Sequence, residues 1–158
     1  MTKLAIPQLI GLASGAGFSG DDLITAVAIA LAESGGDPQA YNPEQSAGAA
    51  QGRGSFGLWQ IYLTAHPEFA GQNLLDPQVN AAAAYAVYSA AGDSFRPWST
   101  FESGAYEANM AAVTQALGSN PDVVASSGDG GPSSSGDLLT LVIAGGLALW
   151  AVGRLLGW

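Results

Sequence analysis

Apolar residues gather in a few segments of the 158-residue chain, and polar residues, glycine or proline bound each segment. One segment, residues 23–32, is apolar except for a single threonine. Ser19 and Asp21 precede it as candidate N-caps, and Gly35-Gly36 follow it as a stop signal. This pattern predicts a helix that runs to about Ser34. Because every face of this helix is apolar, we expect it to be buried on every face.

The beginning of the chain also predicts a helix. Lys3 is followed by the apolar stretch Leu4–Ala13, which resembles the start of a signal peptide in its charge and hydropathy. Pro7 and Gln8 interrupt the stretch, and it continues into the capped helix described above. We therefore interpret it as the first helix of a folded domain, with a cleaved signal peptide as the alternative.

Two more helices complete the predicted domain, which is mainly α. The alanine-rich segment Asn80–Ala91 follows Asp76-Pro77, a typical helix start. Residues 105–118 form the other helix, which ends at a glycine. Residues 37–54 are rich in proline, glycine and short polar side chains and predict a loop. Signals for strands are weak, because no long alternating run of valine or isoleucine occurs.

The C-terminal part of the chain has a different pattern. Residues 126–136 contain only serine, glycine, aspartate and proline, which predicts a flexible linker spanning roughly 18 Å. Leu138–Trp158 is nearly all apolar, and as a helix it would be about 31 Å long, enough to cross a bilayer. Arg154 near its end could reach the headgroups. The chain thus divides into a domain (1–125), a linker (126–136) and a transmembrane helix (137–158); a core helix or a helix docked into a partner protein are the alternatives.

Composition excludes several classes of function. The chain has 13 acidic and 4 basic residues, a formal net charge of −9, which argues against binding to nucleic acid. It has no cysteine, and His66 is its only histidine, so a thiolate nucleophile or a histidine-based metal cage is not available. We predict no cofactor and no metal site. Catalysis, if present, depends on carboxylates, hydroxyls and amides.

Glu33 is the most unusual residue of the predicted domain. It lies at the C-terminal end of the apolar helix, where unpaired carbonyl groups disfavour a carboxylate. Burial also disfavours the charged form. Both effects would raise the pKa of Glu33, which is the condition for a general acid near neutral pH. An exposed last-turn glutamate, or one satisfied by a hydrogen bond in the core, is the alternative.

Four sequence blocks resemble the lysozyme-like soluble lytic transglycosylases, in the same order as in that family. They are Ala28-Ile-Ala-Leu-Ala-Glu33-Ser34-Gly-Gly-Asp37-Pro38, Ser55-Phe-Gly57-Leu58-Trp59-Gln60-Ile61, Asn73-Leu-Leu75-Asp76-Pro77 with Asn80 and Ala84, and Trp98-Ser99-Thr-Phe101-Glu-Ser-Gly104-Ala-Tyr106. The last block is similar to the ending of phage-type members. It departs from the common Tyr-Asn-x-Gly ending, which puts the identity of the aromatic ligand in doubt.

The resemblance implies a small lysozyme-like fold and cleavage of the bond between N-acetylmuramic acid and N-acetylglucosamine in peptidoglycan. It implies Glu33 as the general acid and later the base, while the 6-hydroxyl of the substrate closes a 1,6-anhydro sugar. The resemblance implies no second carboxylate. Asp37, four residues after Glu33, is the alternative partner, but Gly35-Gly36 interrupt the helix between them, and we interpret Asp37 as a cap of its loop.

The resemblance also implies the residues that bind substrate: Ser55, Gln60, Tyr62 and Tyr106. Gln60 can donate and accept hydrogen bonds to sugar groups. Gly57 would let the backbone approach a sugar closely. Trp59 and Tyr62 either stack on sugar rings or pack in the protein. Tyr106 resembles a tyrosine that meets the catalytic glutamate, and a core tyrosine is the alternative.

The sequence therefore predicts a membrane-tethered lytic transglycosylase that acts on glycan strands, with its catalytic domain on the outer face or in a virion. We expect it to open the wall locally during genome entry, with other virion proteins as possible partners. A bacterial envelope-remodelling enzyme is the alternative source. The alternative activities are a lysozyme-type hydrolase, a non-catalytic glycan-binding virion protein and a pore-forming lysis protein.

Overall fold

A computed structural model of the chain describes residues 2–44 and 53–119. The predicted boundary at residue 125, the linker 126–136 and the apolar segment 137–158 lie outside the described residues. In the described part no helix has the length and hydropathy needed to cross a membrane. The elements, in chain order, are α1 (Ile6–Ala16), α2 (Gly20–Ser34), β1 (Tyr41–Pro43), β2 (Gly54–Phe56), β3 (Ile61–Tyr62), the 3-10 helix η1 (Pro67–Phe69), α3 (Pro77–Ala90), α4 (Ser99–Glu102) and α5 (Glu107–Gly118).

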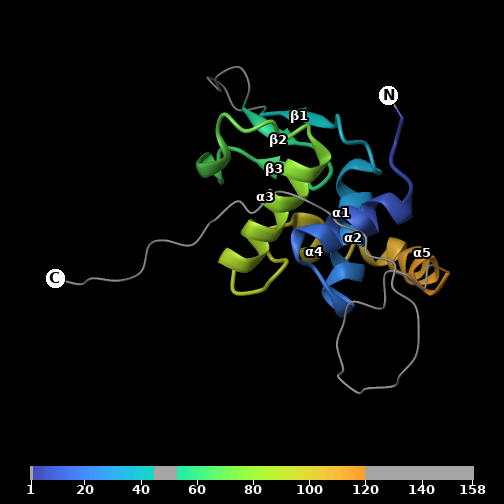
Figure 1. Cartoon of the computed structure of the whole chain (residues 1–158). Coiled ribbons are helices and arrows are strands. Elements are labelled where there is room, and N and C mark those ends of the chain that lie inside the picture. The colour runs from blue at the N-terminus through green and yellow to red at the C-terminus, as the bar shows by residue number, and fades with distance from the viewer. Residues whose placement is uncertain (1, 45–52, 120–158) are drawn as a thin grey trace, which may run out of the picture. The chain divides into compact units, whose positions relative to one another are not determined.

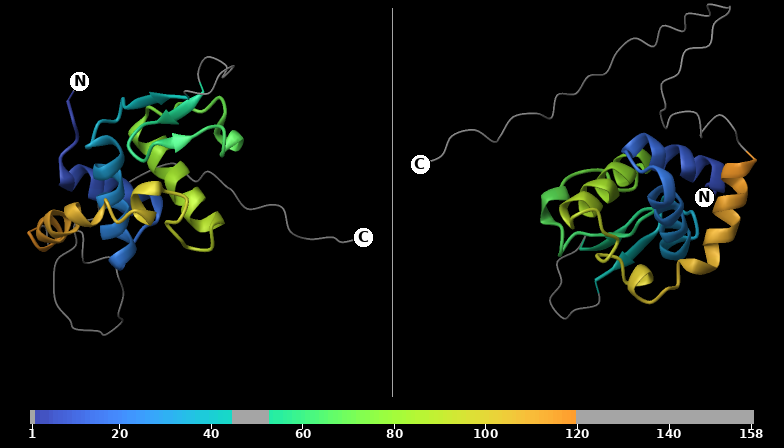
Figure 2. Two further views of the ribbon diagram at one scale, coloured as in Figure 1. Left: turned by 180° about the vertical axis from the view of Figure 1, so that it is seen from behind. Right: turned by 90° about the horizontal axis from the view of Figure 1, so that it is seen from below.

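Helix α2 is the centre of the domain. Figure 2 shows it in the middle of the helices, with α1 and α5 packed against it. Its residues Ala26–Ala30 are completely buried, and Leu23, one turn earlier, is also buried. Gly35 ends the helix in the left-handed conformation (φ 61°), and its N–H donates to the Leu31 carbonyl. The predicted helix and its glycine stop are confirmed. Burial on every face is not, because Ile24 and Leu31 are only partly buried.

The three other predicted helices are also present, with small shifts at their ends. The segment at the start of the chain forms α1, and Pro7 occupies its first turn, where a missing N–H costs little. Helix α3 begins at Pro77, three residues before the predicted start, because the Asp76 carboxylate caps it by accepting from the N–H groups of Gln78 and Val79. The segment predicted at 105–118 forms α5.

The prediction of a loop over residues 37–54 is wrong at two places. Tyr41–Pro43 forms β1, and β2 begins at Gly54. These strands pair antiparallel in a three-stranded sheet of order β1-β2-β3, which lies on one side of the helices (Figure 1). The strands have only two or three residues each, so they carry no alternating pattern; tertiary pairing rather than local propensity forms them.

Aromatic side chains join the end of α1 to α3 and to the segment that leads into α4. Phe18 lies edge-on to Tyr85 and Tyr88, with ring centroids 5.0 and 5.2 Å apart, and stacks on Phe95. Tyr88 donates a hydrogen bond to the Asp22 carboxylate at 2.7 Å. This cluster holds the segment after α3 in place through Phe95. It therefore helps to set the position of α4 beside the end of α2.

Candidate active site

Glu33 is the penultimate residue of α2 and is half-buried. The Thr100 hydroxyl of α4 donates to its Oε1 atom at 2.7 Å. Burial is the largest influence on this carboxyl and raises its pKa, while the side-chain and backbone hydrogen bonds from Thr100 act in the opposite direction without cancelling it. The expected direction of the pKa shift is therefore confirmed.

Asp37 has the role of a loop cap. Its Oδ1 atom accepts from the Gln39 N–H at 2.9 Å, closing a turn just after α2. The two glycines between it and the helix both have positive φ angles, which change the direction of the chain. This carboxylate is therefore engaged in its own turn, as the sequence predicts.

Ser55 and Tyr62 are brought together by the sheet. They are cross-strand partners on β2 and β3, and Asn42 of β1 lies opposite Ser55 on its other side. Directly paired residues point to the same face of a sheet, so these three side chains form a polar row across it. Tyr62 is 37% exposed, and its hydroxyl donates to the Glu44 carboxylate at 3.0 Å.

Gln60 lies in the tight turn between β2 and β3, with a left-handed backbone (φ 46°). Its amide nitrogen donates to the carbonyls of Gly57 (2.9 Å) and Ala40 (3.2 Å). Within residues 2–44 and 53–119 its amide oxygen has no partner, so this oxygen can accept a hydrogen bond from a ligand. The side chain lines a small cavity of about 80 Å³ together with Tyr62, Trp98 and others.

The two tryptophans of the matched blocks are structural. Trp59 is 1% exposed, so it cannot stack on a sugar, and its indole N–H donates to the Ala26 carbonyl of α2 at 2.9 Å. The Trp98 indole donates in turn to the Trp59 carbonyl at 2.8 Å. We call Trp59 and Trp98 the tryptophan pair. Of the two aromatic residues whose role the sequence left open, only Tyr62 remains available to substrate.

Asn80 explains the third block and corrects the role expected for Gly57. Asn80 is fully buried; its Oδ1 accepts from the Trp59 N–H, and its amide nitrogen donates to the carbonyls of Phe56 and Leu74. A side chain at Gly57 (φ 72°) would overlap Asn80 and the Leu74 carbonyl. Gly57 is therefore needed for packing against Asn80, and not for the approach of a sugar.

Tyr106 lies just before α5 and stacks on Phe101, with ring centroids 5.1 Å apart. Its backbone N–H points to the Thr100 carbonyl at 3.4 Å. Among the described residues, the side-chain hydrogen bond to Glu33 comes from Thr100. Sequence reasoning missed Thr100; its only signal is its position two residues after Trp98 in the last matched block.

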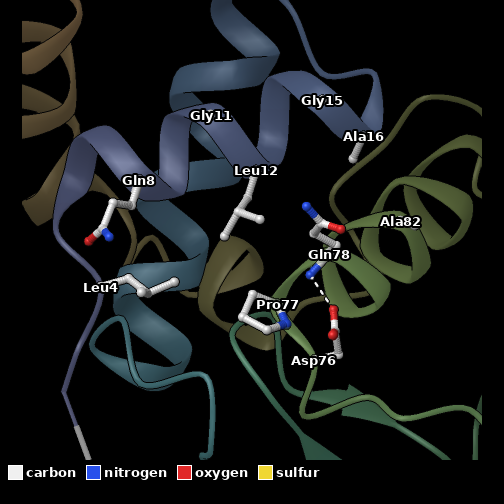
Figure 3. A pocket seen from close by; sticks show the side chains of 10 residues that line it. All are labelled: Leu4, Gln8, Gly11, Leu12, Gly15, Ala16, Asp76, Pro77, Gln78 and Ala82. Atoms are coloured by element: carbon white, nitrogen blue, oxygen red, sulfur yellow. Dashed lines mark hydrogen bonds between the residues drawn. The ribbon is translucent and has the colours of Figure 1, made fainter. Parts of the chain in front are cut away.

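A second hollow lies elsewhere. Figure 3 shows a groove of about 830 Å³ between α1 and the first turns of α3, lined among others by Gly11, Gly15 and Gln78. Its lining includes none of the residues Glu33, Ser55, Gln60 and Tyr62. Asp76, which does line it, caps α3. We therefore place the candidate active site at Glu33. In the part of the chain that the structure describes, no group of three acidic or histidine residues could hold a metal ion.

Comparison with known proteins shows the family to which the chain belongs. The sequence model of the family described as lysozyme-like domain matches residues 10–100, more than half of the chain. The chain belongs to the lysozyme-like domain family. This family comprises glycosidases and transglycosylases that act on peptidoglycan. No curated protein and no solved structure shows significant similarity to the chain.

The family match covers α2, the sheet and α3, and it ends at Thr100. Glu33, Ser55, Gln60 and Tyr62 all lie inside it. Tyr106 lies outside the matched range, and its side chain packs on Phe101.

Proposed function

We propose that this protein is a peptidoglycan lytic transglycosylase in which Glu33 is the general acid and base. One observation carries the proposal: a half-buried carboxyl with a raised pKa lies at the end of the central helix of a lysozyme-like domain. A carboxyl whose pKa is raised keeps its proton at higher pH, so it can deliver that proton to a leaving oxygen.

The reaction balances with this single carboxyl. Protonated Glu33 gives its proton to the glycosidic oxygen, and the bond from that oxygen to the anomeric carbon of N-acetylmuramic acid breaks. The 6-hydroxyl of the same sugar then bonds to the anomeric carbon, and the Glu33 carboxylate takes the hydroxyl proton. The products are a 1,6-anhydro sugar and a free 4-hydroxyl group, and Glu33 is protonated again.

Two acidic residues near the site have other partners, which supports a mechanism without a second carboxylate. Asp37 closes its own turn, and Glu44 accepts from Tyr62 and Thr64 at 3.0 and 2.7 Å. A hydrolase that uses two carboxyl groups needs the second one across the scissile bond from the acid, where it acts as a nucleophile or activates water.

Glycan binding is assigned to the polar groups near the sheet. Ser55 and Tyr62 would contact the glycan from the polar row, and Asn42 extends that row by one strand. The amide oxygen of Gln60 would accept from an N-acetyl N–H or a hydroxyl group. Tyr106 would orient Glu33 indirectly, because its ring stacks on Phe101 and its backbone N–H donates to the Thr100 carbonyl.

The masses of the released muropeptides test the proposed reaction. Purified protein is incubated with peptidoglycan, and the products are compared with those of the Glu33→Gln variant. Anhydro products, each one water lighter than the hydrolysed form, support the transglycosylase. Uniformly hydrated products would show a lysozyme-type hydrolase, and identical activity of the variant would remove Glu33 from the mechanism.

The setting of the enzyme is proposed from the sequence alone. The apolar segment 137–158 would anchor the protein in a membrane, with the catalytic domain on the outer face or inside a virion, where it would open the wall during genome entry. Tethering raises the local concentration of enzyme at its substrate. Residues 1–137 hold 3 basic and 13 acidic residues, a net charge of −10, so attraction to an anionic wall does not replace the tether.

Deleting residues 126–158 tests this setting. A tethered enzyme loses its membrane association but keeps activity on soluble wall fragments. A pore-forming protein driven by the C-terminal segment would lose all lytic activity.

A further inference from the structure

Thr100 is the residue that contacts the proposed acid most directly. Its hydroxyl donates to Oε1 of Glu33 at 2.7 Å, and its backbone also hydrogen-bonds the same carboxyl. We propose that Thr100 is a positioning residue that makes Oε1 the accepting oxygen of Glu33 and so places the catalytic proton on Oε2. This inference rests on the proposed function, because it concerns how Glu33 performs its reaction.

The chemistry of a neutral carboxyl group gives the reason. Such a group has one carbonyl oxygen, which accepts hydrogen bonds, and one hydroxyl oxygen, which donates its proton. A hydroxyl that donates to Oε1 stabilises the form in which Oε1 is the carbonyl oxygen. The proton then lies on Oε2, the other oxygen of the carboxyl group.

The same hydrogen bond gains strength as the reaction proceeds. When Glu33 transfers its proton, the bond from Thr100 becomes charge-assisted, and such bonds are roughly twice as strong as neutral ones. An interaction that is stronger in the transition state than in the ground state increases kcat. Thr100 therefore orients the acid before the transfer and stabilises the carboxylate that forms.

The tryptophan pair holds Thr100 in a fixed place relative to Glu33. Trp98 lies two residues before Thr100 and donates to Trp59, which donates to Ala26 of α2. Ala26 and Glu33 belong to the same helix and are about 10 Å apart along its axis. Both tryptophans are buried, at 1% and 5% exposed. The start of α4 is therefore joined to α2 through Trp59 and, at the part-buried bond from Thr100, directly to Glu33.

Three variants of the full chain test the assignment. Thr100→Val removes the hydroxyl and keeps the shape, Thr100→Ser keeps the hydroxyl, and Thr114→Val is a matched control on α5, where the threonine hydroxyl bonds only its own helix. The readouts are kcat, KM and the pH profile of glycan cleavage, with circular dichroism to check folding.

We expect Thr100→Val to lower kcat about tenfold or more, the effect of losing a hydrogen bond to a charged group, with a smaller change in KM. Loss of a donor that favours the carboxylate also raises the pKa of Glu33 further, so the basic limb of the pH profile should move to higher pH. Thr100→Ser should restore both properties, and Thr114→Val should resemble the unmodified chain.

Two results would overturn the inference while leaving the proposed function intact. One is a folded Thr100→Val variant with unchanged kcat and pH profile. The other is a Thr100→Ser variant as impaired as Thr100→Val, because then the methyl group and not the hydroxyl matters. If Glu33→Gln keeps full activity in the same assay, the proposed function itself fails.

Discussion

Asn80 and Glu33 are both polar side chains that lie on helices and face the interior. Hydrogen bonds satisfy the side chain of Asn80, whereas the surroundings of Glu33 disfavour its charged form. Asn80 is fully buried, and its amide makes three hydrogen bonds, to Trp59, Phe56 and Leu74. Glu33 is only half-buried, and its burial outweighs the hydrogen bonds from Thr100, so the pKa of its carboxyl is raised.

This difference distinguishes a polar residue that stabilises the fold from one that takes part in a reaction. A buried polar group that organises a fold must have its hydrogen bonds satisfied, because an unsatisfied one costs about 1–3 kcal/mol. A group that must give up a proton is instead kept in surroundings that disfavour its charged form. Asn80 connects the second and third matched blocks, and this connection holds the sheet beside the end of α2.

Glu33→Gln should give the largest functional effect. We expect activity on peptidoglycan to fall by a hundredfold or more, since an amide cannot donate a catalytic proton. Stability should not fall with it. Because the pKa of Glu33 is higher in the folded state than in the unfolded state, the ionised carboxyl opposes folding. The protonated carboxyl favours folding at low pH, and this contribution is lost as pH rises through the folded-state pKa.

At neutral pH the glutamine variant should therefore be at least as stable as the unmodified chain. Muropeptide release and urea denaturation at pH 7 check the two halves. Loss of activity together with a large loss of stability would mean that Glu33 has a structural role like that of Asn80.

Asn80→Asp should have the opposite signature. Aspartate has nearly the same shape as asparagine, but it cannot donate the two hydrogen bonds to the carbonyls of Phe56 and Leu74. Its carboxylate would instead face these two carbonyl oxygens. We expect the free energy of unfolding to fall by about 3 kcal/mol. Asn73→Asp, at an exposed position, is the control with the same change in charge. Equal stability of the two variants in urea denaturation would contradict the structural role of Asn80.

Gly57→Ala tests the packing beside Asn80. The added methyl group overlaps Asn80 and the Leu74 carbonyl, at a φ of 72° that disfavours alanine, so we expect destabilisation of about 2 kcal/mol. Gly11→Ala on α1 is the matched change, because nothing lies within 4 Å of its new methyl group. It should stabilise the helix by about 0.5–1 kcal/mol. Thermal unfolding midpoints that move in the same direction would be inconsistent with this packing.

Tyr88→Phe should have the smallest effect, a loss of about 1 kcal/mol at pH 7 from the missing bond to Asp22. That bond and burial raise the pKa of Tyr88 to about 12. A raised pKa means that neutral Tyr88 stabilises the fold fully below its unfolded pKa, about 10, and less as pH rises toward 12. Urea denaturation from pH 7 to 11 should show the stability gap narrowing above pH 10; a gap that widens would be contrary to this sign.

The sequence predicts α1, α2, α3 and α5 and the direction of the pKa shift of Glu33, for physical reasons that are local. An apolar run bounded by Ser19 and Gly35 specifies α2 without reference to the rest of the chain, and Asp76 before Pro77 specifies the start of α3. The raised pKa of Glu33 follows from the burial of its carboxyl, which the apolar run before it predicts.

The sheet and the partner of Glu33 depend on contacts between distant segments. Strands of two or three residues have no periodicity, and β1 exists because Tyr41–Pro43 pairs with Gly54–Phe56. Thr100 meets Glu33 across 67 residues, and its position two residues after Trp98 does not by itself indicate this contact. The sequence places Gly57 beside a sugar and leaves the role of Trp59 open, because the block around them is matched as a whole. The packing shows that both residues are buried.

The most direct test of the account is a titration of the Glu33 carboxyl in the full chain, followed by the carbon-13 shift of its carboxyl carbon in the presence and absence of bound glycan fragments. The account predicts a midpoint above the ordinary value for glutamate, and a further rise in Thr100→Val. A midpoint at or below that ordinary value in both states would contradict it.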